Sequence, residues 1–112
     1  MKEIIAVIRP SRLHKVRDAF RTLAGFPGMS ISHIEGCSSH AGAEQDETLK
    51  EELTDFSKKV RIEIVAPDEM VDDILRIIHQ NAYTGKTGDG VLWVTEVKEF
   101  IRLCKSAPHI SG

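Results

Sequence analysis

The sequence is poor in aromatic residues, which make up 5% of its 112 residues, and it has no excess of positive charge. Its 15 lysines and arginines are balanced by 17 aspartates and glutamates, so the net charge is −2. Proteins that bind nucleic acids usually carry a basic surface, and those that bind single strands add aromatic stacking platforms. We therefore expect no nucleic-acid partner.

Long apolar runs and paired cysteines are absent as well. No segment approaches the roughly 20 apolar residues of a membrane span, and the first residues lack the apolar run and cleavage site of a signal peptide. Cys37 and Cys104 lie far apart and form neither a CxxC pair nor a zinc-binding spacing. We expect a cytoplasmic protein with no membrane insertion and two free thiols.

The hydrophobic pattern predicts a single domain over residues 1–112. Strands are expected near 4–8, 29–36, 60–65 and 91–97, the second with a bulge because its alternation is irregular. Two helices follow the first and third strands, with Ser11 and Asp68 as expected N-caps. Their apolar faces are Leu13, Val16, Phe20 and Leu23 in one helix, and Val71, Ile74, Leu75 and Ile78 in the other.

The order strand, helix, strand, strand, helix, strand predicts the α+β class and a ferredoxin-like βαββαβ sandwich. Such a fold has a four-stranded antiparallel sheet with both helices on one face. Apolar residues on the other face would need a cover, which oligomerisation supplies most simply.

Residues 37–57 follow no clear period and are rich in acidic side chains. A stretch of this length without regular structure is usually a functional loop or partly disordered. Part of it, residues 46–56, has Leu49 and Leu53 four positions apart and is compatible with a short helix.

A glycine-rich loop covers residues 84–90, with the sequence TGKTGDG, and leads directly into the last strand. Backbone N–H groups of such a loop can converge on an anion, and Lys86 adds a charge suited to phosphate. On composition alone a plain turn is the simpler interpretation, because Gly-Asp-Gly is common in turns.

Taken in order, these residues resemble the PII signalling family, the small trimeric proteins of nitrogen regulation. The resemblance covers nearly the whole chain. The matching motifs are Met1-Lys2 with Ile4, Arg9-Pro10, Val16-Arg17, Gly28-Met29-Ser30, Lys59 to Val65, the 84–90 loop and Ile101-Arg102. Residues 84–90 correspond to the family's B-loop, residues 37–57 to its T-loop, which contacts partners, and residues 98–112 to its C-terminal tail.

The resemblance implies a homotrimer that binds adenine nucleotides (ATP, ADP or AMP) between subunits and has no catalytic task. Thr87, Gly88, Asp89 and Gly90 would hold the phosphates, largely through backbone N–H groups, and Lys59 and Arg102 would add positive charge. The adenine and ribose would be surrounded by Gly28, Met29, Ser30, Glu63 and Val65. Gly36 would stand at the base of the T-loop, close to the ligand.

Several positions depart from the family pattern. Ser39 stands where the family has an arginine, and His40 where it has the glutamine that helps hold magnesium and 2-oxoglutarate. The resemblance therefore supports binding of these two effectors less than binding of a nucleotide. Val91 stands where a lysine follows the B-loop, and Cys104 where a second C-terminal arginine falls. Since each charge-assisted hydrogen bond contributes about 1.5–3 kcal/mol, the changes favour weaker ATP binding or a preference for ADP or AMP. Glu52 replaces the modified T-loop tyrosine, so uridylylation is not expected.

The resemblance implies a regulatory enzyme or a membrane transporter as the T-loop's partner, and the protein would be recruited to the membrane only through a transporter.

Two alternatives to a nucleotide-sensing function stay open. His33, Cys37 and His40 cluster in sequence and suit zinc or copper, as in a metal-responsive PII-like or CutA-like regulator, although no fourth ligand is evident. A slow nucleotide hydrolase is the other, although the five histidines are scattered and form no readable triad.

Overall fold

The computed structural model describes residues 1–36 and 56–104. Within them, the elements follow the predicted order, and a short 3-10 turn precedes each helix. They are β1 (Lys2–Ile8), η1 (Pro10–Arg12), α1 (Leu13–Phe20), β2 (Ser30–Gly36), β3 (Ser57–Ala66), η2 (Asp68–Met70), α3 (Val71–Ala82) and β4 (Gly90–Glu96). No helix among the described residues is long and apolar enough to cross a membrane.

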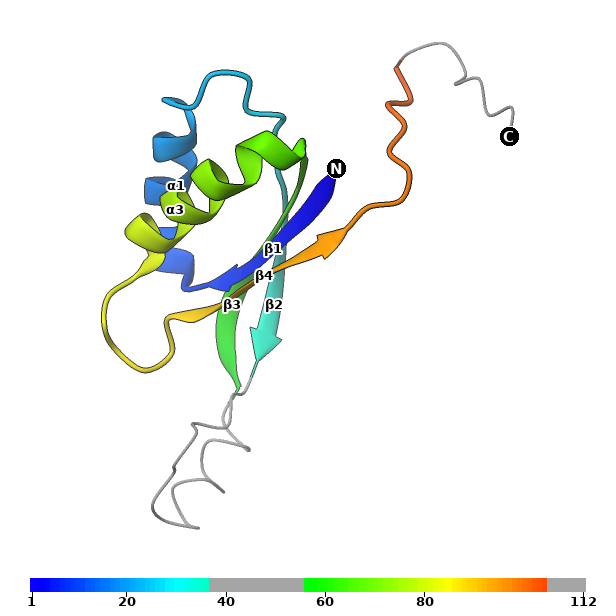
Figure 1. Cartoon of the computed structure of the whole chain (residues 1–112). Coiled ribbons are helices and arrows are strands. Elements are labelled where there is room, and N and C mark those ends of the chain that lie inside the picture. Colours follow the sequence, from blue (N-terminus) through cyan, green and yellow to red (C-terminus); the bar gives the residue numbers. More distant parts are fainter. Residues whose placement is uncertain (37–55, 105–112) are drawn as a thin grey trace.

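The strands form one antiparallel sheet in the order β2-β3-β1-β4, and α1 and α3 cover the same face of it (Figure 1). This is the predicted ferredoxin-like arrangement, and the prediction is confirmed. The central strands β1 and β3 lie in unbroken register from the Lys2–Ala66 pair to the Ile8–Val60 pair.

The core lies between the helices and the two central strands. Every second residue of β1 and β3 points to the helices and is buried, and each helix adds the residues of one face. The buried set is Ile4, Ala6 and Ile8 from β1; Val60, Ile62, Ile64 and Ala66 from β3; Val16 and Phe20 from α1; and Val71, Ile74, Ile78 and Ala82 from α3. Each large member stabilises the fold by about 1.5–3 kcal/mol, so this layer fixes the sheet beneath the helices.

The opposite face of the sheet carries apolar side chains that no helix covers. Val91 and Trp93 lie on this face, since Trp93 pairs with Ile5, and their exposed fractions are 59% and 39%. Ile5 itself is buried between Glu63 and Trp93 of the flanking strands. The predicted uncovered apolar face is therefore present in the single chain.

Both predicted N-caps are wrong. Ser11 lies inside η1, and neither helix start nor either 3-10 turn has a side-chain cap hydrogen bond. Each helix instead begins through a 3-10 turn at or after a proline, whose fixed φ suits a helical start. Asp68 pairs with the N-terminal ammonium group of Met1 at 3.0 Å. The first helix also ends at Phe20, so Leu23 packs from the following turn.

The predicted bulge in the second strand is wrong as well. The pairing of β2 with β3 runs without interruption from Ser30–Glu63 to Gly36–Ser57. The alternation is irregular because β2 is an edge strand that is mostly exposed. Of the predicted loop 37–57, only residues 56 and 57 are described, and Ser57 already belongs to β3. The predicted helix over 46–56 lies almost wholly outside the described residues.

Candidate functional site

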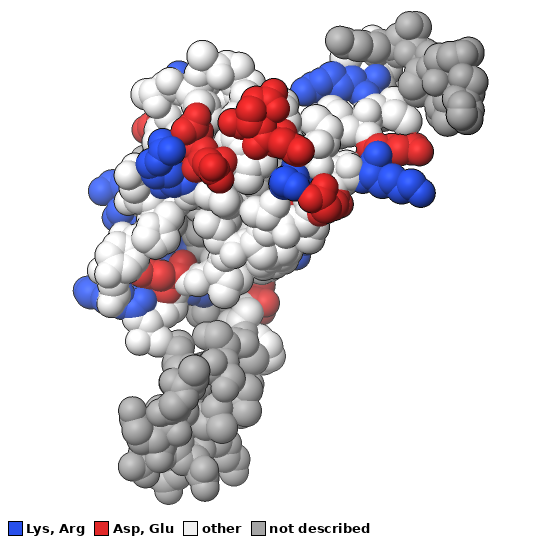
Figure 2. All heavy atoms as spheres, in the orientation of Figure 1, with Lys and Arg blue, Asp and Glu red and all other residues white. Residues whose placement is uncertain are grey.

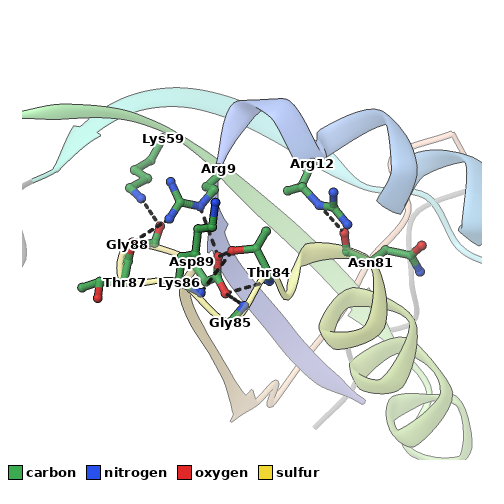
Figure 3. Close-up of polar contacts among 10 residues, drawn as sticks. All are labelled: Arg9, Arg12, Lys59, Asn81, Thr84, Gly85, Lys86, Thr87, Gly88 and Asp89. Carbon is green, nitrogen blue, oxygen red and sulfur yellow. Dashed lines mark hydrogen bonds and ion pairs between the residues drawn. The ribbon is translucent and has the colours of Figure 1, made fainter.

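The B-loop (residues 84–90) is closed into a ring by the carboxylate of Asp89. This carboxylate accepts hydrogen bonds from the backbone N–H groups of Thr84 and Gly85 at 2.8 and 2.9 Å, and from the Thr84 hydroxyl (Figure 3). Arg9 Nε donates a further bond at 3.1 Å. The donors from Thr84, together with those from Arg9 and Gly85, hold the pKa of Asp89 well below its ordinary value. Asp89 is thus a charged organiser of the loop.

Glycine is required where the B-loop enters β4. Gly90 has φ of +112°, and a Cβ built there would lie 1.8 Å from the carbonyl oxygen of Val7 in the neighbouring strand. Gly88 also has a positive φ, of +96°. Only glycine combines this backbone conformation with so close an approach, so the loop meets the sheet through its backbone.

Two cations lie against the B-loop. The Nη2 of Arg9 donates to the carbonyl oxygen of Thr87 at 2.6 Å, and the ammonium group of Lys59 donates to the carbonyl oxygen of Gly88 (Figure 3). Burial, together with the neighbouring charge of Arg9, lowers the pKa of Lys59. With one carboxylate between two cations, this group is net positive and favours an anion. The expected approach of Lys59 to the loop is therefore found.

Arg9 is a residue of the candidate site that was not predicted from the sequence. The pair Arg9-Pro10 was a signal, but it was used only as one of the motifs that match the PII family. Arg9 and Asp89 are 80 positions apart, and only the pairing of β1 with β4 brings the end of one beside the start of the other. No spacing within one segment predicts this contact.

A cavity of about 510 Å³ opens beside the B-loop, between α3 and β4. Its polar side includes Lys86, Thr87 and Asp89, and its apolar side includes Ile8 and Leu92. We call it the loop cavity. Its mixture of apolar walls and a cationic, glycine-rich rim is typical of a site for a small anionic ligand.

A second cavity, of about 400 Å³, gathers six of the predicted site residues. They are Gly28, Met29, Ser30, Glu63, Val65 and Arg102. We call it the β3 cavity. Glu63 pairs with Arg61 at 3.0 Å, and the Arg102 guanidinium carbon lies 5.2 Å from the centre of the Phe100 ring.

The two cavities share no lining residue. Ile8 lines the loop cavity and Glu3 the β3 cavity, five residues apart along β1, or about 16 Å. Glu63 and Val65 alternate with buried Ile64, so they lie on the face of the sheet away from the helices. Arg102 therefore does not approach the B-loop of its own chain. Gly36, Lys59 and Gly88 line neither cavity. The backbone carbonyl of Gly36 accepts a hydrogen bond from the Ser57 hydroxyl at 3.2 Å.

The structure gives the metal hypothesis no support among residues 1–36 and 56–104, where no group of three potential ligands occurs. Cys37 and His40 lie outside the described residues, so of the three candidates only His33 can be placed, on β2 opposite Val60.

Elsewhere on the surface, the face seen in Figure 2 intermixes acidic and basic side chains, in line with the near-neutral composition.

Comparison with known proteins decides the family. Residues 1–106 match the family model described as nitrogen regulatory protein P-II. The chain belongs to the PII family. It is 39% identical to nitrogen regulatory protein P-II 1 of Escherichia coli and 38% identical to nitrogen regulatory protein P-II of Haemophilus influenzae, in each case over 92% of this chain and 91% of the relative.

A third relative is similar over the same share of this chain. Nitrogen regulatory protein P-II 2 of Methanothermobacter thermautotrophicus is 36% identical, over 92% of this chain and 89% of the relative. The resemblance seen in the sequence is thus confirmed, and the chain is a signal-transduction protein of the PII family.

Proposed function

We propose that this PII protein senses adenine nucleotides, ATP, ADP or AMP, at sites that two copies of the chain build together in a homotrimer. The observation that carries the proposal is that Thr87, Asp89 and Gly90 line the loop cavity, whereas six other candidate residues line the β3 cavity. In a single chain the two cavities share no residue, and they lie on different sides of the sheet, because helix α3 lines the loop cavity whereas Glu63 and Val65 of the β3 cavity face away from the helices. A second copy that brings its β3 cavity to the loop cavity completes the site.

The uncovered face of the sheet provides the contact between copies. Val91 and Trp93 expose apolar surface there, and burying it in a closed ring of identical subunits is favourable. Val91 also lines the loop cavity, which places the apolar face next to the candidate site. Assembly and ligand binding would then use adjoining surfaces.

The two halves suit different parts of a nucleotide. The B-loop with Arg9 and Lys59 is net positive and would take the phosphates. The β3 cavity offers Met29 and Val65 for the adenine, and the hydroxyl of Ser30 and the carboxylate of Glu63 for the polar edges of base and sugar. Arg102 would reach from this half toward the phosphates of the other copy.

The signal would pass through the T-loop, residues 37–57, to a regulatory enzyme or a membrane transporter, and the nucleotide would not be consumed. Because β2 and β3 flank the T-loop and carry Gly36 and Lys59, the state of the site can reach its base. A ligand can change the T-loop only by binding one conformation more tightly than another. Magnesium and 2-oxoglutarate are candidate co-effectors.

Thermal unfolding with added nucleotide tests this function. A ligand present at 100 times its dissociation constant stabilises the protein by about 2.7 kcal/mol, which raises the melting temperature by several degrees in a domain of this size. We expect such a rise with millimolar ATP, ADP or AMP, and a smaller one with inorganic triphosphate, which leaves the β3 cavity empty. Identical melting temperatures with and without all three nucleotides would refute the proposal.

A further inference from the structure

Arg9 holds the B-loop at two points at once. Its Nε donates to the Asp89 carboxylate at 3.1 Å, and its Nη2 donates to the Thr87 carbonyl at 2.6 Å. Between these two acceptors lies Gly88, where a Cβ would stand 3.1 Å from the same Nη2. The guanidinium therefore lies against the middle of the loop (Figure 3).

The bond to Asp89 connects Arg9 with the rest of the ring. The same carboxylate binds the N–H groups of Thr84 and Gly85, at the far end of the loop. Arg9 itself follows directly after β1, the strand buried in the core. The Arg9 side chain thus anchors the whole B-loop to β1, a central strand of the sheet.

Arginine is suited to this task in a way that lysine is not. A guanidinium presents several N–H donors in one plane and can serve a carboxylate and a carbonyl together, whereas an ammonium is a single point charge on a flexible stem. Lys59 illustrates the difference, since its ammonium group serves only the Gly88 carbonyl among the acceptors of the described residues.

We infer that Arg9 is a positioning residue of the phosphate half-site, and that its planar fork, beyond its charge, keeps the B-loop in the shape that accepts phosphate. The inference rests on the proposed nucleotide function. It also assigns a role to a cation held against the B-loop, in a chain that has Val91 where the resemblance places a lysine after this loop. A loop held in place before binding loses less entropy when a ligand arrives.

The test compares Arg9→Lys, which keeps the charge and removes the fork, with Arg17→Lys as a matched control. Arg17 lies on α1 and pairs with the exposed Asp18, away from the B-loop, so its replacement should change nothing at the loop. Amide hydrogen exchange of Thr84 and Gly85 is measured by NMR in the ligand-free protein, and the affinities for adenosine, ADP and ATP are measured by calorimetry.

In Arg9→Lys we expect exchange at both amides to rise about tenfold, and ATP and ADP affinity to fall about tenfold, while adenosine affinity stays the same. Unchanged exchange in Arg9→Lys would overturn the inference, as would an equal loss of affinity for adenosine and ATP, or failure of the variant to fold. If the unaltered protein bound no nucleotide, the proposed function would fall, and a rise in exchange would still show that Arg9 holds the loop.

Discussion

Arg9 and Asp89 form an ion pair at 3.1 Å that joins the end of β1 to the B-loop across 80 positions of sequence. The pair is partly shielded, with 32% of the Arg9 side chain and 20% of the Asp89 side chain exposed. A shielded pair with further hydrogen bonds on its carboxylate contributes more than a solvated surface pair. It explains how a loop with three glycines keeps one shape.

Asp89→Asn should make the stability of the protein less dependent on acid pH. The folded protein holds the pKa of Asp89 below its ordinary value of 3.8, so the stability that the carboxylate adds is present above that pH and is lost as the pH falls through the folded pKa. We expect the variant to melt at a lower temperature near neutral pH and to lose less stability on acidification. Melting temperatures between about pH 5 and 2 test this. Glu99→Gln, at an exposed position, should behave like the unaltered chain.

Gly90→Ala should be far more damaging than Gly28→Ala. Both glycines have positive φ, +112° and +105°, so each alanine carries a similar conformational cost of about 1–2 kcal/mol. Only at Gly90 does the added Cβ meet the Val7 carbonyl, at 1.8 Å, whereas nothing lies within 4 Å at Gly28. We expect the free energy of unfolding to fall by about 3 kcal/mol or more for Gly90→Ala. Equal losses in chemical denaturation would show that β1 and β4 do not approach so closely.

Val91→Lys should tighten ATP binding. Val91 is 59% exposed and lines the loop cavity directly after the B-loop, so an added ammonium group can reach a bound phosphate without burial of its charge. One charge-assisted contact would raise the affinity about tenfold, and more for ATP than for AMP. Gln80→Lys adds the same charge at an exposed position of α3 and is the control. An equal gain in both variants would assign the effect to net charge.

Much of this fold could be predicted because its central elements carry strong periods. Val60, Ile62 and Ile64 alternate along β3, and α3 repeats its apolar residues every three or four positions, since both face a buried core. The bulge predicted in β2 was wrong because β2 is an exposed edge strand. Exposure removes the alternation of apolar and polar residues from which the pairing register of a strand is predicted. The helix starts were misjudged because a proline-initiated 3-10 turn takes the place of a side-chain cap.

Only those parts of the candidate site that lie within one short segment of the sequence could be predicted. The glycines of the B-loop and the motif at Lys59 lie in short segments that can be compared position by position. Arg9 was missed because its partner lies across the sheet. Arg102 lies away from the B-loop of its own chain, so its expected approach to the loop from a neighbouring subunit stays a prediction. Contacts between distant segments, and between copies, depend on the assembled fold.

The most direct test of the account mixes two variants that each lack one half of the site. Lys59→Glu disables the loop half and Arg102→Glu the β3 half, and each variant alone should bind almost no ATP. After unfolding and refolding of an equal mixture, about a quarter of the sites in random trimers combine two intact halves, so calorimetry should recover about a quarter of the original binding sites. No recovery from the mixture would place both halves in one chain and contradict the shared site.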